Sequence, residues 1–106
     1  MTVVDQSKSG VVPASGTLAI PLRSDNGRPW ILQQVGIDAT GVGGGAIGKI
    51  KKNGKIITPF VPTGDAPAGE PFIPMSSTET VTVEWTSAIA GAVCNVTFIY
   101  DDGVPA

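Results

Sequence analysis

The sequence predicts an all-β protein built as a single sandwich domain. Residues 80–85 and 94–100 carry the strongest signal, because apolar side chains alternate with mostly polar ones along both stretches. A period of two is typical of strands that turn one face toward a core and the other toward water. No stretch repeats its apolar residues with the 3.6-residue period of a helix. The 14 glycines and 9 prolines are scattered without a period, as in a fold of short strands and many turns.

About seven or eight short strands joined by long crossings favour a jelly-roll-like sandwich. An immunoglobulin-like sandwich is the alternative, because strand spacing alone does not distinguish the two windings. With 106 residues the chain has room for one core. We divide it into residues 1–15, an extended N-terminal arm or first strand, and residues 16–106, the β-sandwich domain.

Two strands are expected in the first half of the chain. In residues 16–23 three aliphatic side chains alternate with other residues, and Pro21, which has no N–H to donate, indicates an edge strand. Residues 30–39 form a longer strand whose apolar side chains fall on both faces when they are counted with a strict period of two. Two apolar faces are typical of the middle of a sheet, and they also fit a subunit contact.

Asn53-Gly54 is the strongest hairpin signal in the chain, because both residue types accept the positive φ angles of a two-residue turn. The turn joins strands expected at residues 46–52 and 55–60, and a regular ladder across it pairs Ile50 with Ile57. The proline-rich stretch that follows is expected to cross from one sheet to the other. Phe72, Ile73 and Met75 are expected to tuck under the sandwich or to form a short strand.

The composition suggests a surface that is partly covered. Apolar residues make up 42% of the chain and charged residues only 15%. So few charges are consistent with contact to another protein or to copies of the same chain. The net charge of −2 favours no nucleic-acid partner.

The expected environment is a cytosol, because the chain opens without the basic and apolar regions of a secretory leader. No apolar run reaches the length of a membrane helix, so no membrane partner is expected. Cys94 lies on the apolar face of its strand and is expected to be a buried, unreactive thiol.

Residues 43–49 spell G-x-x-x-x-G-K, the pattern of a phosphate-binding loop. The next residue is Ile50 where that loop needs Ser or Thr for magnesium, and a β-hairpin follows where it needs a helix. The overlapping G-x-G-x-x-G pattern fails for the same reason. Both are interpreted as a glycine-rich turn, and no cofactor is expected.

No catalytic or metal site is predicted. The chain contains no histidine, which removes the commonest metal ligand and every Ser-His or Cys-His nucleophile pair. Most of the nine acidic residues fall in expected turns, and Asp101-Asp102-Gly103 lacks the alternating spacing of a calcium loop. We therefore expect a protein that is not an enzyme.

Four of the seven basic residues lie in one hairpin: Lys49, Lys51, Lys52 and Lys55. Lysines at this density commonly guard a solvated sheet edge. An anionic partner surface is the other interpretation, with Lys52 facing Lys55 near the tip.

The second half has a recognisable layout. The hairpin of residues 49–57 (KIKKNGKII) leads to GEPFIP at residues 69–74, then to the strand at 80–85 and to GAVCNVTFIY at 91–100. Over roughly residues 30–102 this layout resembles small all-β virion proteins of tailed bacteriophages, of the capsid-decoration, head-fibre or tail type.

The resemblance implies a structural virion protein, a capsid decoration (cement) protein that binds the outer capsid surface and stabilises it by protein–protein contacts. The implied partners are the major capsid protein and copies of the chain itself, as a dimer or trimer. The implied location is the capsid surface of a virion, after synthesis in the host cytoplasm. The alternative is a carbohydrate- or receptor-binding module of a head fibre or tail, which an exposed Trp30 or Trp85 would favour. The partner-contact residues that we expect are Val3 and Val4 in the arm and Lys49, Lys51, Lys52 and Lys55 in the hairpin.

Overall fold

The computed structural model describes residues 3–39, 41–43, 45–60, 64–68 and 73–104. Within these residues the chain forms nine strands and no helix. The strands are β1 (Val3–Val11), β2 (Leu18–Arg23), β3 (Trp30–Ala39), β4 (Ile47–Lys52), β5 (Lys55–Phe60), β6 (Gly64–Ala68), β7 (Ile73–Met75), β8 (Thr80–Thr86) and β9 (Val93–Asp101).

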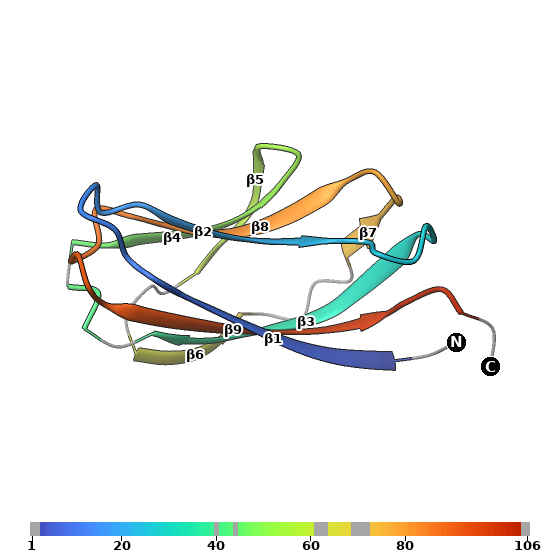
Figure 1. Cartoon of the computed structure of the whole chain (residues 1–106), viewed down its shortest axis with the longest axis horizontal. Coiled ribbons are helices and arrows are strands. Elements are labelled where there is room, and N and C mark those ends of the chain that lie inside the picture. The colour runs from blue at the N-terminus through green and yellow to red at the C-terminus, as the bar shows by residue number, and fades with distance from the viewer. Residues whose placement is uncertain (1–2, 40, 44, 61–63, 69–72, 105–106) are drawn as a thin grey trace.

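Two antiparallel sheets pack face to face, as Figure 1 shows. One sheet has the order β1-β9-β3-β6, with β7 also paired to β3, and the other has the order β2-β8-β4-β5. The predicted all-β sandwich is therefore confirmed. The first stretch, Val3–Val11, is paired with β9 along its whole length.

The winding is that of a jelly roll. Each strand of the first half pairs with a strand of the second half in reverse order, so that β4 pairs with β5, β3 with β6 and β7, β2 with β8, and β1 with β9. The chain is thus one long hairpin about Asn53-Gly54, rolled up until its two halves close on a common core. An immunoglobulin-like winding does not apply, because β1 and β2 lie in opposite sheets here.

The core lies between the sheets and follows the alternation of the sequence. In β8 the residues Val81, Val83 and Trp85 are fully buried, and in β9 every second residue from Cys94 to Tyr100 is buried. The rings of Trp30 and Tyr100 stack with their centroids 4.2 Å apart, which joins β3 to β9 inside the core.

The prediction that β3 has two apolar faces is wrong. A β-bulge interrupts the pairing with β9 between Leu32 and Gln34, so Gln33 is the extra residue. The bulge shifts the alternation by one residue. Trp30 and Leu32 before it and Val35 and Ile37 after it therefore all point into the core.

A second bulge changes the expected register of the hairpin. The Asn53-Gly54 turn has positive φ at both residues, as predicted. The ladder then slips between Ile50 and Lys51, so that Ile50 faces Thr58, not Ile57. Ile73 and Met75 are buried in β7, in agreement with the short strand expected there, whereas Phe72 lies outside the described residues.

Candidate interaction surface

Three loops form one end of the sandwich, which we call the loop end; its described residues are 12–17, 41–43, 45–46 and 87–92. They connect β1 to β2, β3 to β4 and β8 to β9, and Figure 1 shows them together at one end of the long axis, at the left of the view. The molecule is 42 Å long and only 22 and 19 Å across. The loop end is therefore a small surface at the tip of an elongated body.

Backbone hydrogen bonds join the three loops to one another. Val12 N–H donates to Ala92 O and Gly91 N–H to Val12 O, both at 2.8 Å. Ile89 N–H donates to Val42 O at 2.9 Å, which ties the third loop to the second. Val12 and Val42 are buried beneath these bonds at 2% and 0% exposure. The loops are thus held by backbone hydrogen bonds and by the burial of two valine side chains.

No charged residue lies in the stretches that build this end. Residues 9–22, 39–48 and 85–100 contain no Asp, Glu, Lys or Arg. These stretches extend into the flanking strands, and the jelly-roll winding brings the three loops within them, which are far apart in the sequence, to one end of the sandwich. Sequence analysis missed this surface, although the three uncharged stretches could have indicated it once the winding was known.

Exposed aliphatic side chains occupy the loop end and the strand residues beside it. Val11 and Val93 are direct cross-strand partners and are 59% and 50% exposed. Ile89 is 57% exposed at the middle of its loop, close to Gly43, and Ile47 is half exposed beside Thr86. Val11, Val93 and Ile89 present apolar surface with no charged residue within two positions, while Ile47 lies two residues before Lys49.

The opposite end, which we call the turn end, comprises residues 24–29, 53–54, 76–79 and 102–104. Here side chains bond the backbone. Asn26 Oδ1 accepts hydrogen bonds from Arg28 N–H at 3.0 Å and from the buried indole of Trp30, Nε1–H, at 2.9 Å. Asn26 Nδ2 donates to Asp102 O at 3.0 Å, so one amide joins the β2–β3 turn, the core and the C-terminal segment.

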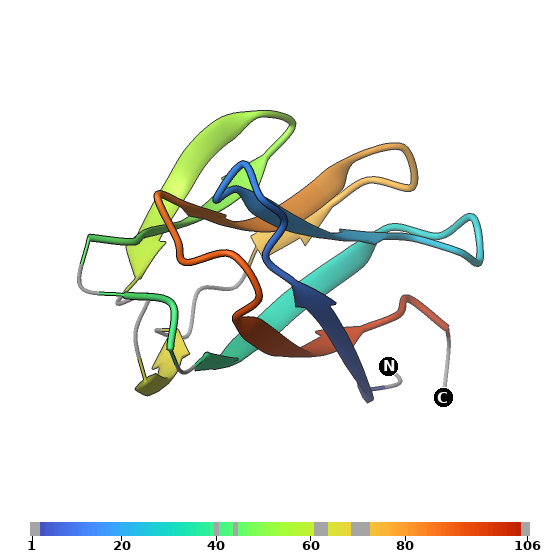
Figure 2. The same cartoon turned by 60° about the vertical axis from the view of Figure 1, so that its left-hand side comes forward.

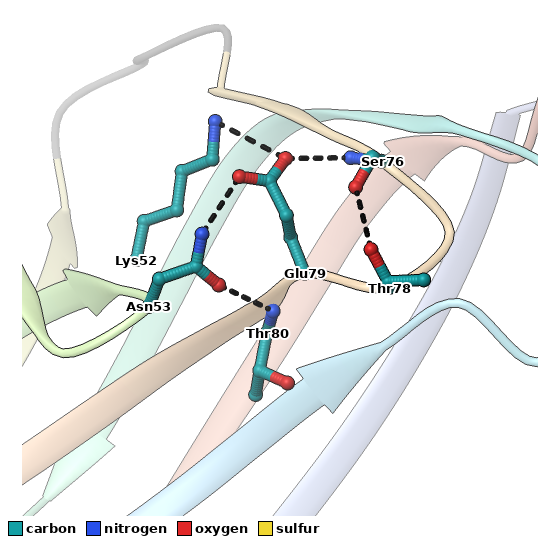
Figure 3. A network of polar contacts seen from close by, with 6 residues as sticks. All are labelled: Lys52, Asn53, Ser76, Thr78, Glu79 and Thr80. Carbon is teal, nitrogen blue, oxygen red and sulfur yellow. Dashed lines mark hydrogen bonds and ion pairs between the residues drawn. The ribbon is translucent and has the colours of Figure 1, made fainter.

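A second network at the turn end centres on Glu79, as Figure 3 shows. One carboxylate oxygen accepts from Ser76 N–H at 2.8 Å and lies 3.5 Å from Lys52 Nζ, and the other accepts from Asn53 Nδ2 at 2.7 Å. These donors favour the charged form, the Ser76 N–H most strongly, and lower the pKa of Glu79. The network fastens the hairpin tip to the turn before β8.

The predicted partner-contact residues do not come together. Val3 is exposed and Val4 half-buried at the start of β1, which is an edge strand of one sheet. The lysines lie on the β4–β5 hairpin at the far edge of the other sheet.

Two of the four lysines are held within the chain. Lys51 pairs with Glu84 at 2.9 Å, and Lys52 approaches Glu79 at 3.5 Å. A partner for Lys49 and Lys55 stays a prediction. As the expected solvated edge requires, Lys55 is exposed.

Other residues that the sequence analysis singled out have structural roles. Burial raises the pKa of the Cys94 thiol, in keeping with a core residue. Trp30 and Trp85 are both buried, at 1% and 0% exposure. Among the described residues no three acidic or cysteine side chains gather in a way that could hold a metal ion.

Comparisons with known proteins add little. No family model and no curated protein matches the chain. Among solved structures the chain is similar to dimeric latent PorU from Porphyromonas gingivalis, with 14% sequence identity and a TM-score of 0.38. That match covers 100% of this chain and 14% of the other, and at this TM-score it bears on neither fold nor function. In the described part of the chain no helix is long and apolar enough to cross a membrane.

Proposed function

We propose that this protein is a capsid decoration protein of a tailed bacteriophage, which attaches to the outer capsid surface through its loop end and stabilises the shell by protein–protein contacts. The observation that carries the proposal is the uncharged, aliphatic surface at one tip of the sandwich. The resemblance of the second half to small virion proteins supports the particular setting.

The chemistry of the loop end favours adhesion to protein. Burial of a charge is costly unless the charge is paired, and this end has no charge to bury. Burial of its aliphatic side chains contributes about 25 cal/mol for each Å² removed from water. The loops are already joined by hydrogen bonds, so less conformational freedom is lost on binding.

The alternative, a glycan- or receptor-binding module, is less well supported. Sugar rings commonly stack on exposed aromatic faces, and both tryptophans of this chain are committed to the core. Trp30 is further occupied by its stack on Tyr100. We therefore keep the decoration protein as the leading proposal.

The test is binding of the purified chain to capsids that lack it, with two matched variants. Ile89 and Ile56 are both 57% exposed, but Ile56 lies on the hairpin opposite Lys51. We expect Ile89→Glu to weaken capsid binding by about tenfold or more, because a buried, unpaired carboxylate costs several kcal/mol. Ile56→Glu should bind as the wild type does. Equal loss in both variants, or wild-type chain that does not bind, would count against the proposal. Glycan-array binding by the wild type would support the alternative.

A further inference from the structure

One edge of the sandwich differs from all the others. Edge strands expose unpaired N–H and C=O groups, and proteins commonly block them with proline, bulges or charge. In the described sheets the edge strands β2, β5, β6 and β7 each contain a proline: Pro21, Pro59, Pro67 and Pro74. β1 is also an edge strand, and its nine residues contain none.

Of the two charged residues on β1, Asp5 and Lys8, the lysine does not block the edge. Lys8 is half-buried on the side of β1 that faces the other sheet. Its ammonium donates to Pro21 O in β2 at 2.8 Å, so Lys8 is turned away toward the neighbouring strand. Figure 1 and Figure 2 show β1 beside β9 with the rest of its sheet behind it. The margin of this sheet is therefore a regular strand that can accept another.

We infer that β1 pairs with the β1 of a second copy, antiparallel about a two-fold axis at Ser7, so that the two copies share one continuous sheet. An axis at Ser7 gives all nine residues of the strand a partner. The outward-facing pairs are Val3 with Val11, Asp5 with Ser9 and Ser7 with Ser7, and the inward-facing pairs are Val4 with Gly10 and Gln6 with Lys8.

This register avoids facing like charges and pairs apolar residues at both ends. Neither Asp5 nor Lys8 faces a like charge, whereas an axis at either residue would set it opposite its own copy. Val3 and Val11, 55% and 59% exposed in the single chain, cover each other at both ends of the pair. An axis at Gln6 would leave Gly10 and Val11 beyond the end of the partner strand. The absence of like-charge pairs and the mutual cover of Val3 and Val11 are the grounds for taking a second copy as the occupant.

The inference is independent of capsid binding, and the self-association of the full chain tests it. Sedimentation equilibrium should show a dimer. Ser7→Lys should weaken that dimer by about fivefold, because two lysines then face each other at the axis. The matched control is Ser9→Lys, because Ser9 is exposed as Ser7 is and the new lysine would lie opposite Asp5 of the partner strand. Ser9→Lys should leave the dimer unchanged or tighter.

A mixing experiment separates the interface from an effect on folding. Ser7→Asp alone should also weaken the dimer, and an equal mixture of Ser7→Asp with Ser7→Lys should associate more tightly than either variant alone. Hydrogen exchange of the wild type should show protection at residues 3–11 that increases with protein concentration. A wild type that stays monomeric up to about 1 mM would overturn the inference. A mixture of the two variants that associates no more tightly than either variant alone would also overturn it, as would protection that increases with concentration at residues other than 3–11. Pairing of β1 with a strand of another protein, and not with its own copy, would overturn it as well.

Discussion

Among the residues whose exposure the structure describes, each end of the sandwich exposes four large aliphatic side chains, but the two sets differ in the charged residues near them. Val11, Ile47, Ile89 and Val93 lie at the loop end, and Val3, Ile31, Ile56 and Val104 lie toward the turn end. Toward the turn end each has a charged neighbour: Val3 and Ile31 both face Asp101, Ile56 faces Lys51, and Val104 follows Asp102 closely. At the loop end Val11, Ile89 and Val93 have no charged residue paired with them or within two positions along the chain, and only Ile47 has one, Lys49. Apolar exposure alone therefore does not mark a binding surface, and the scarcity of nearby charge is the difference.

The ends also differ in what holds them. At the loop end the loops are joined by backbone hydrogen bonds, and no side-chain hydrogen bond is needed to hold Ile89 or Ser15 in place. At the turn end the side chains of Asn26 and Glu79 bond the backbone and are committed to the fold. Polar truncations should accordingly cost stability at the turn end and very little at the loop end.

The largest expected effect is that of Asn26→Ala. The indole N–H of Trp30, a residue only 1% exposed, would lose its acceptor, and the C-terminal segment would lose the bond to Asp102 O. We expect a loss of about 2–3 kcal/mol in the free energy of unfolding, measured in urea. Ser15→Ala, at an exposed position of the loop end, should change it by less than about 0.5 kcal/mol. Equal costs would remove the distinction between the two ends.

An intermediate effect is expected from a pair of glycines with the same backbone. Gly103 at the turn end and Gly41 at the loop end have φ of 75° and 76°. A Cβ at Gly103 would lie 2.6 Å from Pro29 O, whereas a Cβ at Gly41 meets nothing within 4 Å. Gly41→Ala should cost about 1 kcal/mol from the left-handed conformation alone.

Gly103→Ala should cost about 2 kcal/mol or more, because the C-terminal segment must also shift. Thermal unfolding of the two variants measures the difference. A Gly41 variant as costly as the Gly103 variant would show that the loop end is packed as tightly as the turn end.

The smallest expected effect is a dependence on pH at the turn end. The pKa of Glu79 is lowered in the folded chain. The contribution of Glu79 to the free energy of unfolding is therefore present above the ordinary glutamate pKa and is lost as pH falls through the folded-state pKa. The stability difference between wild type and Glu79→Gln should therefore be larger at about pH 7 than at about pH 3. Ser15→Ala should show no such trend. A stability difference between wild type and Glu79→Gln that is larger at acidic pH would contradict a stabilising role of the charged Glu79 carboxylate.

Much of the fold could be predicted because strand alternation and turn chemistry are local. The buried rows of β8 and β9 and the Asn53-Gly54 turn follow directly from neighbouring residues. The bulge at Gln33 could not be predicted, because a glutamine at this position is equally compatible with a regular strand that has no bulge. The loop end was missed for a different reason. Its uncharged stretches are visible in the sequence, but only the winding of the whole chain brings them together.

The most direct test is the orientation of the chain on the particle that carries it, observed by electron cryomicroscopy. We expect residues 12–17, 41–43, 45–46 and 87–92 to lie against the capsid, with the Asn26 and Glu79 networks facing solvent. A particle in which the lysine hairpin or the turn end is seated on the shell, with Ile89 in solvent, would contradict the assignment of the uncharged end as the adhesive surface.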